Sequence, residues 1–196
     1  MKHILIISNI PAPYRSGQFA CLRSRFPEWK VSVLYTGKIE ADRVWETDEP
    51  EGETYFLQSK VLSVKGGEVG GTATRFVHLP KGLLKMLDTL KPDVVIAGEY
   101  NFSAVQALFW AKAHQIPFVN MTDGTLHSES YIGTVQKLTR RMIVSGADSF
   151  LASGTKAAEK LLHWGADEER IAIAYYLLAA FPGKRAWTCW CRPWQK

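Results

Sequence analysis

A chain of 196 residues with 46% hydrophobic residues can bury one hydrophobic core, and two very small domains would explain it less well. Residues 181–196 carry four basic side chains and no acidic one, so residues 1–180 hold 20 basic against 19 acidic groups. Without a basic face, we expect no nucleic-acid partner. Three cysteines make no disulfide framework, and no apolar run approaches the ~20 residues of a membrane span. We expect a cytoplasmic protein, with peripheral contact at the inner face of the membrane left open.

Short apolar runs alternate with helical patterns along the chain, which predicts a parallel sheet. Strands are expected at about residues 3–8, 29–35, 54–57, 61–64, 75–78, 93–97, 116–119, 148–152 and 170–174. Helices are expected at about 17–26, 80–90, 102–114, 128–145 and 157–164. The predicted fold class is α/β: a Rossmann-like, doubly wound parallel sheet in a single domain over residues 1–180. Residues 36–71, with Trp45, are expected to form a mobile excursion.

Two helices have a predicted buried face. In 102–114 we expect Val105, Leu108, Phe109 and Ala113 to point inward. In 128–145 the expected inward residues are Val135, Leu138, Met142 and Ile143, with Lys137, Arg140 and Arg141 outward.

The last residues, 181–196, read FPGKRAWTCWCRPWQK and show neither period nor helix cap. They hold three of the seven tryptophans and two cysteines. We predict that this tail lies outside the domain, as the product of a shifted reading frame or an altered end. The alternative is a tail that docks on a partner.

Two loops should lie along one rim, because ligands of open α/β sheets bind beyond the carboxyl ends of the strands. The first loop holds Glu99, Tyr100 and Asn101, with Asn101 as the N-cap of the next helix. The second begins at Asp123.

The densest polar cluster at a strand end holds Asp123, Gly124, Thr125, His127 and Glu129. Asp123 is the candidate catalytic residue, because a carboxylate there accepts sugar hydroxyls or acts as a base. His127 is a candidate for proton transfer. The alternative is an Asx-turn with Gly124 in a left-handed conformation.

Two further strand-to-helix turns are candidate anion sites. The first holds Pro13, Arg15 and Gly17, where helix is excluded up to Pro13, and its alternative is a proline-stiffened loop. The second holds Ser153, Gly154 and Lys156, and its alternative is a capped helix start. The histidines are too scattered for a metal triad, so no metal is expected.

Four segments in succession resemble a known family: ISNIPAPYRSGQF, KPDVVIAGEYN, IPFVNMTDGTLHSE and RRMIVSGADSFLASGTKAAEKLLHWGADEERI. Over residues 1–174 the chain is similar to the N-terminal domain of family-four-type retaining glycosyltransferases, which have the two-domain GT-B architecture. The resemblance implies hexosyl transfer from a nucleotide sugar, the co-substrate in place of a cofactor, to a glycan or lipid-linked acceptor, as in polysaccharide biosynthesis.

By position, the resemblance implies that residues 11–17 face the donor diphosphate and that Glu99 and Tyr100 line the acceptor side. Asp123 falls where many members place a histidine. The second domain, with its paired glutamates, has no counterpart in the chain, so we expect a truncated acceptor-binding domain, inactive alone and needing a C-terminal domain partner. The alternatives are a non-catalytic glycan-binding module or half of a sugar-nucleotide epimerase.

Overall fold

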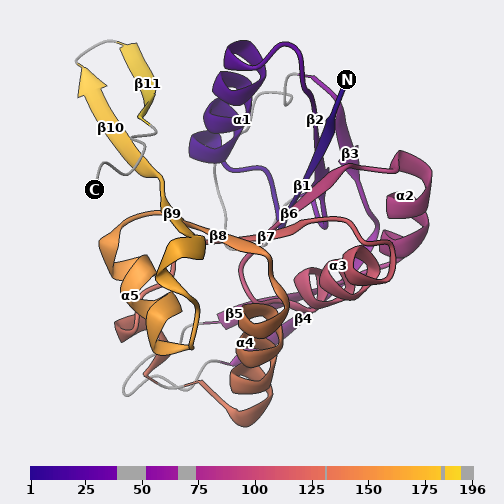
Figure 1. Cartoon of the computed structure of the whole chain (residues 1–196), viewed down its shortest axis with the longest axis vertical. Coiled ribbons are helices and arrows are strands. Elements are labelled where there is room, and N and C mark those ends of the chain that lie inside the picture. The colour runs from indigo at the N-terminus through magenta and orange to yellow at the C-terminus, as the bar shows by residue number, and fades with distance from the viewer. Residues whose placement is uncertain (39–51, 66–73, 131, 182–183, 191–196) are drawn as a thin grey trace.

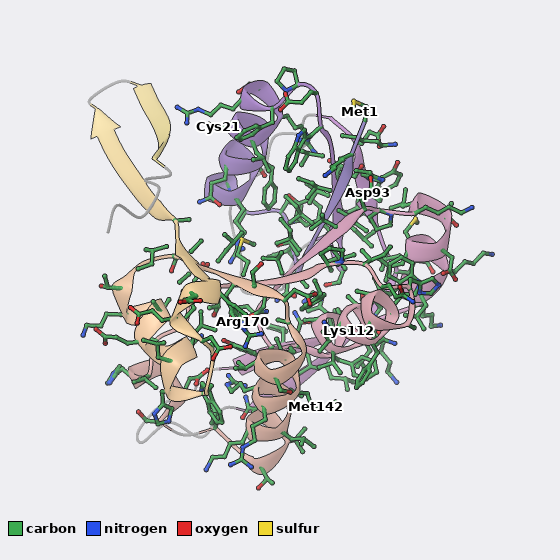
Figure 2. The ribbon with its side chains drawn as sticks, in the orientation of Figure 1. Met1, Cys21, Asp93, Lys112, Met142 and Arg170 are labelled. Atoms are coloured by element: carbon green, nitrogen blue, oxygen red, sulfur yellow. The ribbon has the colours of Figure 1, made fainter. Side chains whose placement is uncertain are left out.

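The computed structural model describes residues 1–38, 52–65, 74–130, 132–181 and 184–190 (Figure 1). Figure 2 shows the ribbon in the same orientation with its side chains. Its centre is a seven-stranded sheet in which every neighbouring pair is parallel. The strand order is β3-β2-β1-β6-β7-β8-β9. These strands are β1 (His3–Ser8), β2 (Lys30–Tyr35), β3 (Thr54–Phe56), β6 (Val94–Gly98), β7 (Phe118–Thr122), β8 (Ser149–Ala152) and β9 (Ile171–Ile173).

The direction of chain progression reverses between β1 and β6, as in a doubly wound sheet. This topology confirms the predicted Rossmann-like α/β fold. The helices are α1 (Pro13–Arg25), α2 (Leu83–Leu90), α3 (Phe102–Ala113), α4 (Thr134–Gly146) and α5 (Thr155–His163), with 3-10 turns η1 (His127–Glu129) and η2 (Glu168–Arg170).

Alternation along the buried strands divides the core between the two faces of the sheet. Phe19 of α1 packs with Ile4, Ile6, Val31 and Val33 on one face. The larger cluster, on the other face, collects residues of α2, α3, α4 and α5 over the alternate positions, such as Leu5 and Ile7. Figure 1 shows α1 on one side of the sheet and α3, α4 and α5 on the other.

Two antiparallel hairpins lie outside the main sheet. The first pairs β4 (Ser59–Lys65) with β5 (Thr74–Pro80), and the second pairs β10 (Tyr175–Phe181) with β11 (Lys184–Trp190). The weak strand signals at 54–57 and 61–64 are thus confirmed, while Trp45 lies outside the described residues. The second hairpin spans the boundary predicted at residue 180, and the origin of the tail stays a prediction.

Helix α1 begins earlier than predicted, at Pro13. Proline at the first position of a helix lacks only an N–H that would have no partner there, and its φ already suits the helix. Arg15 and Gly17 therefore lie within α1, not in the loop before it. Within the described ranges, no helix combines the length and the apolar character needed to cross a membrane.

The predicted inward face of α4 is confirmed at Ile143 but wrong at Val135 and Leu138. Val135 is 75% exposed and Leu138 56% exposed, whereas Ile143 and Val144 are buried. Arg140, predicted to point outward, is mostly buried in an ion pair with Glu129. A charged residue on the buried side of a helix interrupts the hydrophobic pattern from which that side is predicted. Its ion-pair partner is distant in the sequence, so the pattern gives no sign that the residue is buried.

In α3 the prediction is wrong for Phe109, which is 57% exposed, and for Ala113. The buried stripe instead runs through Ala104, Ala107, Leu108 and Ala111, with Trp110 at its side. Small alanines contribute little to a hydrophobic pattern, yet they let α3 pack closely against the sheet.

Candidate functional site

The end of β1 and the start of α3 are joined at the point where the strand order reverses. Asn101 Oδ1 accepts a 2.8 Å hydrogen bond from Ala104 N, which confirms its predicted role as N-cap of α3. Asn101 Nδ2 donates to Asn9 Oδ1 at 2.8 Å. One side chain thus caps a helix and fixes the distance between the two loops that flank the switch point.

An ion pair connects the first turn of α1 to the end of β7. Arg15 Nη2 lies 2.5 Å from Asp123 Oδ2, and the two side chains are 10% and 35% exposed. Arg15 Nη1 also lies 3.7 Å from Met121 Sδ. Asp123 Oδ1 is buried and has no hydrogen-bond partner among the described residues. Asp123 Oδ2 is therefore paired with a cation, while Asp123 Oδ1 is a buried acceptor that a ligand could use.

Glu99 connects the two predicted rim loops. Its backbone is left-handed, with φ of 61°, an uncommon conformation for a residue other than glycine. Glu99 Oε1 accepts from Asp123 N at 3.2 Å, and Thr122 Oγ1 donates to Glu99 Oε2 at 3.5 Å. Asn120 Nδ2 donates to the Glu99 carbonyl at 2.8 Å. The structure thus brings Glu99 and Asp123 together at the carboxyl edge of the sheet.

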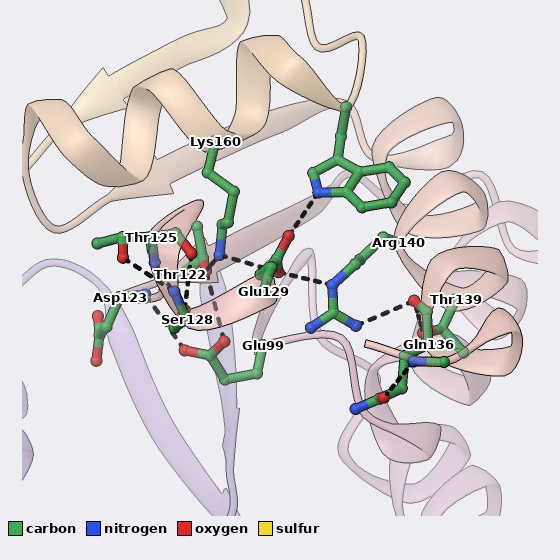
Figure 3. A network of polar contacts seen from close by, with 12 residues as sticks. Glu99, Thr122, Asp123, Thr125, Ser128, Glu129, Gln136, Thr139, Arg140 and Lys160 are labelled. Atoms are coloured by element: carbon green, nitrogen blue, oxygen red, sulfur yellow. Dashed lines mark hydrogen bonds and ion pairs between the residues drawn. The ribbon is translucent and has the colours of Figure 1, made fainter. Parts of the chain in front are cut away.

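Behind this edge lies Lys160, a residue that the sequence analysis missed. It is fully buried, and its Nζ donates to Thr122 Oγ1 at 2.6 Å (Figure 3). The same Nζ lies 4.7 Å from the centre of the Tyr100 ring and 3.9 Å from Glu129 Oε1. Burial lowers the pKa of Lys160, and the Glu99 and Glu129 carboxylates oppose that shift. Its burial could have been predicted from the sequence, because Lys160 lies beside Ala157 and Leu161 on the apolar face of α5.

Glu129 holds η1 against two helices. Its Oε1 accepts from Arg140 Nε of α4 at 2.6 Å, and its Oε2 accepts from Trp164 Nε1, next to α5, at 2.6 Å. Figure 3 shows Glu129 between Lys160 and Arg140. Arg140 also lies 4.9 Å from the centre of the Tyr100 ring, so this ring contacts two cations. Tyr100 is therefore buried beneath the rim, and burial raises its pKa.

Gly124 has a different role from the left-handed turn considered above. It is absent from the positive-φ glycines of the described chain, so the left-handed alternative is wrong. A Cβ at this position would lie 2.8 Å from Lys160 Nζ. A side chain at position 124 would thus displace the ammonium of the buried lysine. Next to it, Thr125 N donates to Ser128 Oγ at 3.1 Å, and His127 is exposed in η1.

The turn after β8 makes fewer contacts with the carboxyl edge of the sheet than the loops after β6 and β7 do. Ser153 N donates to the Thr122 carbonyl at 3.1 Å, and Gly154 is the extended N-cap of α5. Lys156 Nζ is exposed and paired with Glu159 Oε2 at 2.8 Å. Pro13 and Gly17 lie in the first turns of α1 on either side of Arg15. Within the described part of the chain, no three His, Cys, Asp or Glu side chains form a group that could hold a metal ion.

Comparison with known proteins gives no matching family model and no matching curated protein. Solved structures do match. They include Staphylococcus aureus MnaA with UDP (TM-score 0.54, 17% identity, 88% of this chain and 44% of that chain). A second is Anabaena Alr3699/HepE with UDP and glucose (TM-score 0.61, 12% identity, 89% of this chain and 44% of that chain). A third is UDP-N-acetylglucosamine 2-epimerase from Rickettsia bellii (TM-score 0.55, 20% identity, 88% of this chain and 44% of that chain).

These likenesses establish the class of the fold. The chain is a Rossmann-like α/β unit that matches one half of GT-B-like proteins, and it spans about 44% of the length of the three chains just named. At these identities the likeness concerns the fold alone.

Proposed function

We propose that the chain is the acceptor-binding half of an enzyme that transfers a hexosyl group from a nucleotide sugar to a glycan or lipid-linked acceptor. The observation that carries the proposal is the Arg15–Asp123 ion pair at the switch point, where Asp123 Oδ1 has no hydrogen-bond partner in the part of the chain that the structure describes. Sugar hydroxyls are hydrogen-bond donors that suit such a carboxylate. Two solved structures that share the fold are complexes with UDP-glucose and with UDP and glucose.

The residues around the pair suit fixed positioning of a ligand. The backbone N of Asp123 is held by Glu99, and Thr122 beside it is held by Lys160. Transfer requires donor and acceptor to meet in near-attack geometry, so a rigid rim contributes by orienting the acceptor hydroxyl. Arg15 supplies a guanidinium that suits the oxygens of a departing diphosphate. In this proposal Asp123 contacts the sugar, and a further unit holds the nucleotide.

A sugar-nucleotide epimerase half is the second candidate. It is favoured by two solved structures that share the fold and are UDP-N-acetylglucosamine 2-epimerases. Epimerisation moves a proton at carbon, and Asp123 and Glu99 are two carboxylates on one edge that suit such a step. A non-catalytic glycan-binding module remains the third candidate, with the same residues acting only as hydrogen-bond acceptors.

Saturation-transfer NMR on the 196-residue chain tests the proposal with UDP-glucose, UDP, glucose and UDP-N-acetylglucosamine. We expect transfer to the protons of the sugar ring, reduced roughly tenfold in Asp123→Asn. Lys85→Gln, an exposed lysine of α2, is the control and should leave the signal unchanged. Absence of transfer to every sugar-containing probe would overturn the proposal.

The same samples separate the candidates. A second set of sugar signals growing in the UDP-N-acetylglucosamine sample, and absent in Asp123→Asn, supports an epimerase. A further sample with a free oligosaccharide and no nucleotide sugar tests the third candidate. Saturation of that oligosaccharide, reduced in Asp123→Asn, without saturation of any nucleotide sugar supports a glycan-binding module.

A further inference from the structure

A concave site lies on the helical side of the molecule, apart from the Arg15–Asp123 pair. It is a hollow of about 610 Å³ between the segment before α4, α4 itself and the end of α5. Its lining residues are Leu126, Glu129, Ser130, Ile132, Lys137, Arg141, His163 and Trp164. Neither Arg15 nor Asp123 contributes to it. We call these eight residues the α4–α5 hollow.

Three side chains of the hollow carry or can carry positive charge. Lys137 and Arg141 project from α4, one turn apart, and His163 ends α5. All three are exposed, and none has an ion-pair partner within the described ranges. Cations that stand one helical turn apart repel each other unless an anion lies between them.

The only acidic residue of the hollow does not compensate these charges. Both carboxylate oxygens of Glu129 are already engaged, Oε1 by Arg140 and Oε2 by the indole N–H of Trp164, each at 2.6 Å. Its side chain is only 7% exposed. The charge of Glu129 is therefore largely offset by Arg140, and the field within the hollow is left positive.

One part of the wall of the hollow is apolar. Leu126 is an exposed leucine, and Ile132 lies nearby. Trp164 has given its N–H to Glu129, so it offers the hollow an aromatic surface without a free donor. An ordinary surface ion would leave this wall exposed to water. The combination favours a ligand with two parts, one charged and one apolar.

We propose that the α4–α5 hollow binds an organic anion in which a phosphate or carboxylate group is joined to an apolar or aromatic group. The guanidinium of Arg141 and the ammonium of Lys137 contact the anion, and the faces of Trp164 and Leu126 cover the apolar part. This inference is independent of the sugar site, because it rests on residues that do not contact that edge.

The test uses 1-naphthyl phosphate as the probe, with inorganic phosphate and 1-naphthol as its two halves. Binding to the full chain is followed by backbone amide shifts in a titration. We expect saturable binding with shifts centred on residues 126–130, 137–141 and 163–164, and each half should bind at least about tenfold more weakly. Equal affinity for either half alone would contradict a two-part site.

Matched charge variants make the test specific. Lys137→Gln combined with Arg141→Gln should weaken naphthyl phosphate roughly tenfold or more. Lys81→Gln combined with Lys85→Gln removes the same charge from the region of α2 and should leave the affinity unchanged. If both double variants weaken binding equally, the effect is one of net charge and the hollow is not the site.

Two further experiments test the apolar contact and the source of the anion. Leu126→Ser should weaken naphthyl phosphate a few-fold and leave inorganic phosphate unaffected, since it removes apolar contact only. Co-sedimentation with phosphatidylglycerol vesicles distinguishes the source of the anion. Sedimentation that depends on Lys137 and Arg141, together with soluble naphthyl phosphate binding, assigns the hollow to a lipid headgroup. Sedimentation without soluble binding would overturn the proposed pocket.

Discussion

Arg15 and Asp123 lie 108 residues apart in the chain, yet their side chains meet at 2.5 Å across the point where the sheet changes direction. The first belongs to α1 on one face of the sheet, and the second follows β7 at its carboxyl edge. The pair thus fixes α1 against the rim loop. It is also the part of the candidate site in which a cation and an unsatisfied carboxylate oxygen occur together.

The first prediction concerns the stability of this pair. Asp123→Asn removes the carboxylate that lies 2.5 Å from the mostly buried Arg15 guanidinium. The free energy of unfolding should therefore fall by about 1–2 kcal/mol, less than for a fully buried pair because Asp123 is partly exposed. Urea denaturation measures the difference. Lys156→Gln, which breaks the exposed Lys156–Glu159 pair, is the matched control and should cost under about 0.5 kcal/mol. Equal losses would mean that solvent screens both pairs alike.

The second prediction concerns the contact between Gly124 and Lys160. Gly124→Ala places a Cβ 2.8 Å from Lys160 Nζ but 4.0 Å from its Cε. The ammonium must then move from Thr122, at a cost of about 1–3 kcal/mol. Because methionine ends at Cε, Lys160→Met should remove most of that cost. A double-mutant cycle measured by urea unfolding checks this, and a coupling energy near zero would show that the clash is relieved elsewhere.

The third prediction is a pH dependence of stability. Burial lowers the pKa of Lys160 below 10.5 in the folded protein. Between that lowered pKa and 10.5 the unfolded chain binds more protons than the folded one, so the contribution of Lys160 to stability rises with pH across this window. Below the window the cost of burying the charge is fully present.

Lys160→Met removes this titration. The difference in unfolding free energy between the wild type and Lys160→Met should therefore shift in favour of the wild type as pH rises toward 10.5. The raised pKa of Tyr100 acts in both proteins and largely cancels in the difference. A difference that stays flat from about pH 7 to 10.5 would show that the carboxylates compensate burial fully.

The fourth prediction separates the two hydrogen bonds of Asn101. Asn101→Ala loses both the cap of α3 and the bond to Asn9, and should cost about 1–2 kcal/mol. Asn101→Asp keeps an acceptor for Ala104 N and adds a favourable charge at the helix N-terminus, so it should cost less. Thermal unfolding ranks the two variants. If they are equally destabilised, the Asn9 bond, and not the cap, carries the stability.

Some features were predictable because they depend on neighbours in the sequence. The strand at His3–Ser8 matched its prediction, and the cap at Asn101 follows from a bond made three residues away. The meeting of the Glu99 and Asp123 loops followed from a general rule, since parallel strands end at the same edge. Their chemical roles remain proposals.

The sequence by itself determined the alternation of strands and helices, and hence the doubly wound sheet, because periodicity and turn residues act over a few positions. Tertiary structure alone decided the burial of Lys160, the ion pair of Arg140 with Glu129, and the face that α4 turns to the core. A buried charge is tolerated only beside partners that desolvate with it. The partners of Lys160 and Arg140 lie on other helices and strands, so the order of the strands in the sheet decides whether these side chains meet.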